Sequence, residues 1–100
     1  MSSAPVNADS FMEFVKTLAG QEITTLKQRK PFTVSVNVEG MTFTPSSGTP
    51  RLHQRRYVEK VLEQFNRTHS YITTEYNTNG IVNASYQLAL IRRYLNQPAP

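Results

Sequence analysis

The sequence predicts a small α+β protein in which three helices pack on one face of a three-stranded antiparallel sheet. Three observations favour this class. Residues 32–44 alternate apolar and polar side chains with a period of two, which is typical of paired strands. Apolar residues recur at helical spacing near both ends of the chain and in the region after Pro50. The length of 100 residues suits one domain, which we place at 9–97 behind a flexible tail at 1–8.

The first predicted helix covers residues 10–19, and a short strand follows it. One apolar stripe at i, i+3, i+4 and i+7 supports the helix and consists of Phe11, Phe14, Val15 and Leu18. Asp9 or Ser10 can cap its start, and Gly20 is a natural stop. The next run, 22–26, is rich in isoleucine and threonine and is predicted to form the first strand.

The clearest element is a hairpin with strands at 32–38 and 41–44. We predict a two-residue turn at Glu39–Gly40. Val38 then opposes Met41 and Val36 opposes Phe43, so the apolar side chains of both strands share one face. The other face carries only uncharged hydrogen-bonding residues, namely Thr33, Ser35, Asn37, Thr42 and Thr44.

Two further helices are predicted, at 50–66 and 84–96. Thr49 as cap and Pro50 as first residue mark the start of the earlier helix. Its apolar stripe consists of Val58, Val61, Leu62 and Phe65. Between these helices, residues 68–83 are rich in Thr, Asn and Tyr, and we expect a weak hairpin or a functional loop there.

Positive charge is concentrated in residues 27–56. This window has six basic residues and one acid, Glu39, and so a net charge of +5, whereas five bases and six acids elsewhere give −1. Clustered charge of one sign attracts a polyanion. The predicted hairpin brings 27–31 and 45–51 to the same end of the sheet. We therefore expect one basic patch there, beside the N-terminus of the second helix.

The basic patch predicts a small, non-enzymatic protein that binds nucleic acid, with duplex DNA as the expected form. The predicted contact residues are Lys27, Gln28, Arg29, Lys30, Ser46, Ser47, Arg51, His53, Arg55 and Arg56. Further candidates for base contacts in the loop at 71–79 are Tyr71, Tyr76, Asn77 and Asn79. Two alternatives stay open. One is an interaction module that docks an acidic protein, and the other is an enzyme that acts on a phosphorylated small molecule bound at 46–51.

The last helix is apolar on more than one side, which predicts a homodimer through Tyr86, Leu90 and Tyr94. The chain has no cysteine, and its two histidines stand apart in the sequence. We therefore predict no metal, no cofactor and no catalytic residue. The chain shows no signal-peptide pattern and no apolar run of about 20 residues, so we expect a cytoplasmic protein without a membrane partner.

Overall fold

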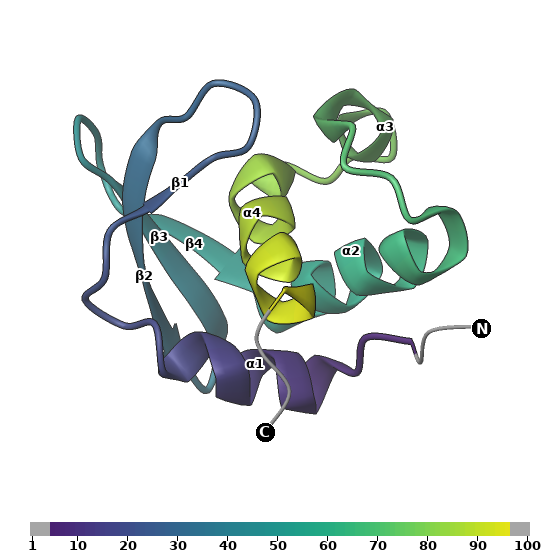
Figure 1. Cartoon of the computed structure of the whole chain (residues 1–100), viewed down its shortest axis with the longest axis horizontal. Coiled ribbons are helices and arrows are strands. Elements are labelled where there is room, and N and C mark those ends of the chain that lie inside the picture. Colours follow the sequence, from purple (N-terminus) through teal and green to yellow (C-terminus); the bar gives the residue numbers. More distant parts are fainter. Residues whose placement is uncertain (1–4, 97–100) are drawn as a thin grey trace.

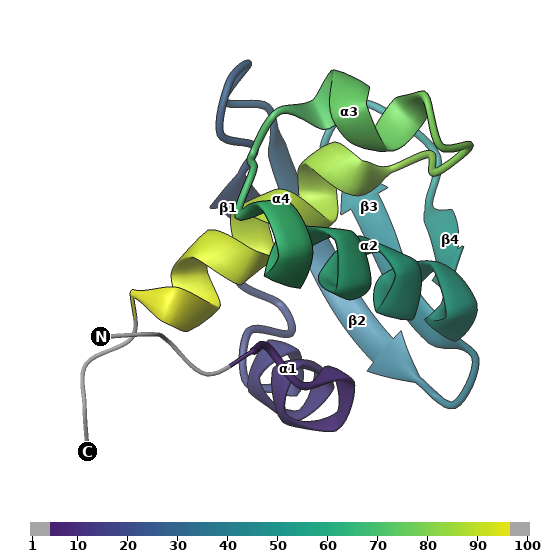
Figure 2. The ribbon, with the colours of Figure 1, turned by 90° about the vertical axis from the view of Figure 1, so that its right-hand side faces the viewer.

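The computed structural model describes residues 5–96 and confirms the α+β class, but with four strands and four helices rather than three of each. The strands are β1 (Ile23–Thr24), β2 (Pro31–Asn37), β3 (Gly40–Pro45) and β4 (Arg51–Gln54), and they form one antiparallel sheet in that order. The helices are α1 (Ala8–Lys16), α2 (Arg55–Thr68), α3 (Thr73–Asn77) and α4 (Ala84–Leu95). Helices α2 and α4 lie across one face of the sheet, and α1 packs against β2 and α4 (Figure 1 and Figure 2).

Aromatic side chains fill the core between the sheet and the helices. Phe32 of β2 and Phe43 of β3 meet edge to face, with ring centroids 5.9 Å apart. Tyr86 of α4 stacks on Phe43 at 5.2 Å, which fixes the N-terminal end of α4 over the sheet. At the other end of α4, Tyr94 meets the ring of Phe11 in α1 at 5.8 Å. Aromatic contacts therefore hold α4 at both ends.

The three residues predicted for a dimer interface pack within the chain. Leu90 has no exposed surface (0%), so it is not available to a second copy. Tyr86 and Tyr94 are half-buried against the sheet and α1, as described above. The apolar surface of α4 that the sequence left without a partner is thus covered by the sheet on one side and by α1 on another.

The hairpin forms, but its register differs from the prediction by two residues. Val36 opposes Met41 and Val34 opposes Phe43, and Val38 lies in the turn with 97% of its surface exposed. The Asn37 side chain stabilises this turn by accepting a hydrogen bond from the Glu39 amide at 2.9 Å. A shift of two preserves the face of every side chain, so Met41 and Phe43 are buried as expected.

Residues 51–54 form a strand, and the predicted helix start at Thr49–Pro50 is wrong. β4 pairs with β3 and places His53 opposite Met41, which satisfies backbone groups that would otherwise form the edge of β3. No residue of the predicted apolar stripe precedes Val58, so periodicity gave residues 50–54 no reason to be helical. Helix α2 starts at Arg55, with Gln54 as a cap residue whose side chain makes no capping hydrogen bond.

Residues 69–83 contain the short helix α3 rather than a hairpin. The Tyr76 side chain is buried, and its hydroxyl donates to the Ser70 carbonyl at 2.7 Å. Gln64 of α2 ties the segment down, because its amide donates to the Glu75 carbonyl (3.2 Å) and accepts from Asn79 Nδ2 (2.6 Å). The segment is therefore anchored on α2.

The predicted tail, 1–8, falls partly outside the described residues, as does the predicted domain end at 97. The described part of the tail is docked. Val6 is buried, and its amide and carbonyl are hydrogen-bonded to the side chain of Asn66 in α2 at 2.8 and 3.1 Å. Asn7, rather than Asp9 or Ser10, caps α1 by accepting from the Ser10 amide at 3.1 Å.

Candidate functional site

A cleft of about 530 Å³ opens at the N-terminal end of α4. Its walls come from the β1–β2 loop (25–30), the segment around α3 (71–77) and the start of α4 (83–88), with Arg51 from β4. Figure 1 shows the N-terminal end of α4 between the β1–β2 loop and α3. Three segments that are distant in sequence therefore enclose one hollow. We call it the basic cleft because of the cations on its walls.

Among residues 5–96, three cations line the basic cleft, namely Lys27, Lys30 and Arg51, and no aspartate or glutamate does. All three are exposed. None of them belongs to an ion pair within residues 5–96. The cleft therefore has a formal charge of +3 that no acid on its walls offsets, so it attracts anions.

Thr25 fixes the loop that holds two of these cations. This buried residue donates its backbone N–H to the Lys30 carbonyl and accepts the Lys30 N–H on Oγ1, both at 3.0 Å. The loop between them turns sharply, with Arg29 in the left-handed region at φ +53°. Lys27 and Lys30 thus project from a closed loop with both ends fixed on the sheet.

Arg51 reaches the cleft because it is the first residue of β4 and pairs with Phe43. The Ser46 amide donates to the Pro31 carbonyl at 3.2 Å and brings the end of β3 beside the start of β2. The predicted meeting of residues 27–30 with Arg51 therefore occurs at this end of the sheet.

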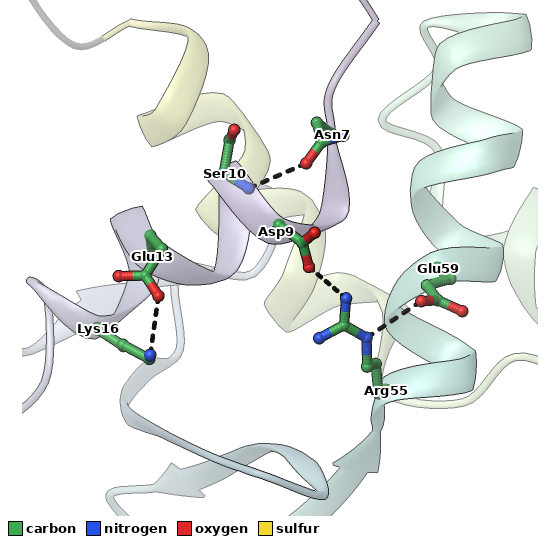
Figure 3. A network of polar contacts seen from close by, with 7 residues as sticks. All are labelled: Asn7, Asp9, Ser10, Glu13, Lys16, Arg55 and Glu59. Carbon is green, nitrogen blue, oxygen red and sulfur yellow. Dashed lines mark hydrogen bonds and ion pairs between the residues drawn. The ribbon is translucent and has the colours of Figure 1, made fainter.

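Arg55 and Arg56 lie at the opposite end of β4, roughly 13 Å away at about 3.3 Å per residue. The Arg55 amide donates to the Glu39 carbonyl at 2.9 Å, beside the β2–β3 turn. Its guanidinium bonds Asp9 and Glu59 (Figure 3). The hydrogen bond to Asp9 is the main cause that raises the pKa of Arg55 above its ordinary value. The basic run 51–56 is therefore divided, and only Arg51 belongs to the cleft. The N-terminus of α2 lies away from it.

His53 belongs to the core. Its Nε2 lies 2.6 Å from Gln87 Oε1, and the Gln87 amide nitrogen donates to the Val58 carbonyl at 3.0 Å. Because this second bond turns the amide oxygen toward the ring, Nε2 is the protonated nitrogen. Burial lowers the pKa of His53 below its ordinary value, so the ring is neutral at pH 7, and it does not line the cleft.

Some of the remaining predicted residues line the cleft, and others lie outside it. Gln28, Tyr71 and Asn77 line it. Arg29, Ser46 and Ser47 are exposed but not on its walls. Tyr76 and Asn79 serve to anchor the α3 segment, as described above.

The start of α4 is the part of the cleft that sequence reasoning missed. Asn83 to Tyr86 line it, although none of the binding residues predicted from the sequence lies in this segment. Asn83 takes a left-handed conformation (φ +64°), and its side chain makes no capping hydrogen bond. The positive end of the helix dipole therefore adds to the field of the cleft. Two features of the sequence could have pointed to this part of the cleft, namely the absence of charge in residues 79–86 and the Asn-Gly turn at its start.

Comparison of the chain with protein-family models, with curated proteins and with solved structures found no match in any of the three. Within residues 5–96, no helix is long and apolar enough to cross a bilayer, and no three His, Asp or Glu side chains gather as metal ligands. The function therefore has to be argued from the geometry and charge of the site.

Proposed function

We propose that the protein binds nucleic acid in the basic cleft, with Lys27, Lys30 and Arg51 neutralising phosphate groups. The observation that carries the proposal is the presence of three unpaired cations on one concave surface without an acid. A lysine or arginine that neutralises a phosphate releases condensed counterions, and this release supplies most of the affinity of non-specific binding.

The uncharged polar groups of the cleft suit the rest of a nucleotide. The cleft walls also carry hydroxyl and amide side chains, among them Thr25, Gln28, Thr73, Thr74, Asn77 and Ser85. Half or more of the hydrogen bonds between proteins and DNA go to phosphate and sugar oxygens, from side chains of these kinds. The proposed site therefore holds the backbone of the ligand first and its bases second.

A free phosphorylated small molecule is the second candidate, because a cleft of about 530 Å³ has the size typical of small-molecule sites. Binding at 46–51 is not supported, because Arg51 is the only residue of that segment on the cleft walls. The two candidates share the same three cations and differ in the number of phosphates that the ligand presents.

The test compares two arginines that the sequence placed in one patch and the structure separates. Fluorescence anisotropy would follow binding of a labelled oligonucleotide at about 50 mM salt, where each phosphate contact adds about tenfold in affinity. We expect Arg51→Gln to weaken binding by about that factor. Arg56→Gln, which removes the same charge at the other end of β4, should leave the affinity within about twofold. Equal losses in the two variants would contradict a site in the cleft.

A further inference from the structure

A second hollow, of about 240 Å³, continues the basic cleft along α4. Its walls come from β1 and the C-terminal half of α4, including Arg92, Arg93 and Asn96. Leu26 lines both hollows. The guanidinium of Arg92 lies 5.6 Å from the ring centroid of Tyr71, which lines the basic cleft. We call the two hollows together the α4 groove.

The α4 groove carries a row of positive charge. Two arginines, Arg92 and Arg93, extend the three cations of the basic cleft, and Glu22 is the only acid on the walls among the residues that the structure describes. From Asn83 to Asn96 the groove follows 13 residue steps of α4, which is about 20 Å at 1.5 Å per residue. At about 3.4 Å per stacked nucleotide, this length matches roughly six nucleotides of one strand.

Two flat groups, the ring of Tyr71 and the guanidinium of Arg92, lie against each other where the hollows meet. Tyr71 is half-buried, with its edge held by Phe65 at 5.2 Å, and partial burial raises its pKa. The exposed guanidinium of Arg92 lies over the ring of Tyr71. Unpaired bases stack on tyrosine rings and on arginine planes, whereas the bases of a duplex are already stacked on one another.

The size of the cleft favours a single strand over a double helix. A hollow of about 530 Å³ is too small to enclose a duplex, whose major groove alone is about 12 Å wide. The three cations lie on the walls of this hollow. One strand is narrow enough to enter.

We infer that the ligand of this protein is a single nucleic-acid strand that lies along the α4 groove, with its phosphates on the five cations and a base at Tyr71. This inference rests on the proposed function and replaces duplex DNA, the form expected from the sequence. Phosphate and stacking contacts do not distinguish DNA from RNA, so both are included in the test.

The experiment measures the affinity of the whole chain for oligo-dT and oligo-U of about two, four, six and ten nucleotides, for a duplex of about ten base pairs and for dTMP. We expect affinity to rise with length up to about six nucleotides and then to level off. The duplex should bind at least tenfold more weakly than a strand of equal length, and dTMP more weakly still. Rising affinity in either the DNA or the RNA series supports the inference.

Two sets of variants locate the strand. In the double variant Arg92→Gln/Arg93→Gln, three cations remain, and the six-nucleotide affinity should fall to near the four-nucleotide value. The charge-matched control, Arg56→Gln/Lys60→Gln on the exposed part of α2, should keep the full length dependence. Tyr71→Leu should weaken binding of six nucleotides by roughly 5- to 150-fold, the range of one lost base stack, and a thermal melt would show whether it is folded.

Each contrary outcome has one meaning. A duplex that binds as tightly as the single strand, or dTMP that binds as tightly as six nucleotides, would overturn the single-strand inference and leave the basic cleft in place. Retention of the length dependence in Arg92→Gln/Arg93→Gln would do the same. No binding of any of these ligands at about 50 mM salt would instead overturn the proposed function.

Discussion

Gly40 is the position where one methyl group should disturb the fold most. It begins β3 at φ +143° and packs against the backbone of β4. A Cβ atom built there would lie 2.3 Å from the His53 carbonyl oxygen and 2.7 Å from the Arg55 amide nitrogen. Both neighbours are backbone atoms: His53 belongs to β4, where the sequence predicted helix rather than strand, and Arg55 is the first residue of α2. Gly40→Ala therefore tests the pairing of β3 with β4.

Two effects add up in this variant. The unfavourable φ costs about 1–3 kcal/mol. Relief of the overlap requires β4 to move and weakens hydrogen bonds worth about 0.5–1.5 kcal/mol each. We expect a total loss of about 3–5 kcal/mol, which is a large part of the roughly 5–15 kcal/mol of stability of such a domain. At about 4–8 °C per kcal/mol, the melting temperature should fall by at least about 12 °C.

Two other glycines serve as controls in the same thermal melts, followed by circular dichroism. Gly80 has φ +77° and nothing within 4 Å of a built Cβ, so Gly80→Ala should lose only the conformational part, about 1–2 kcal/mol. At Gly48 a Cβ would touch Pro45 at an ordinary 3.7 Å, and Gly48→Ala should be neutral or slightly stabilising. If Gly40→Ala melts no lower than Gly80→Ala, β4 is not packed against β3 as described.

Two further predictions concern the core and the α3 segment. Burial lowers the pKa of His53 below 6.5, so below pH 6.5 the unfolded chain binds more protons than the folded one, and stability should fall as the pH drops through this window. Urea midpoints between about pH 7.5 and 5 should show this loss for the wild type and for His69→Gln but not for His53→Phe. A flat wild-type curve would refute a buried neutral His53. Tyr76→Phe removes the 2.7 Å hydrogen bond to the Ser70 carbonyl and should reduce the free energy of unfolding by about 0.5–1.5 kcal/mol; an unchanged urea midpoint would show that this hydroxyl does not anchor the segment.

The hairpin and the helical stripes were predictable because each depends on local periodicity. The buried residues Val58, Val61, Leu62 and Phe65 all lie on α2, and the alternation in 32–44 placed Met41 and Phe43 on the buried face. The register was not predictable, because the sequence Asn-Val-Glu-Gly at 37–40 allows a two-residue turn at 38–39 as well as at 39–40. The choice between them depends on contact of Gly40 with β4, which lies more than ten residues away.

The site was predicted in part, for a similar reason. The approach of 45–51 to 27–30 follows from an antiparallel hairpin, and the pairing of β4 with β3 fixes the place of Arg51 there. The separation of Arg55 from Arg51 depends on four residues, 51–54, whose strand conformation comes from pairing with β3 and not from their own pattern. The burial of His53 and Leu90 likewise depends on which other elements cover them, and this cannot be predicted from the local sequence.

The salt dependence of binding tests the central claim most directly. If Lys27, Lys30 and Arg51 neutralise three phosphates of a single strand, the plot of log K against log salt concentration for a short oligonucleotide should have a slope of about −2, at about −0.7 per phosphate. Affinity should then fall by about twentyfold between 50 and 200 mM salt. The triple variant Lys27→Gln/Lys30→Gln/Arg51→Gln, in which only Arg92 and Arg93 of the α4 groove remain, should have a slope no steeper than about −1.4. A wild-type slope near zero, or a triple variant that keeps the wild-type slope, would contradict the assignment of the basic cleft as the binding site.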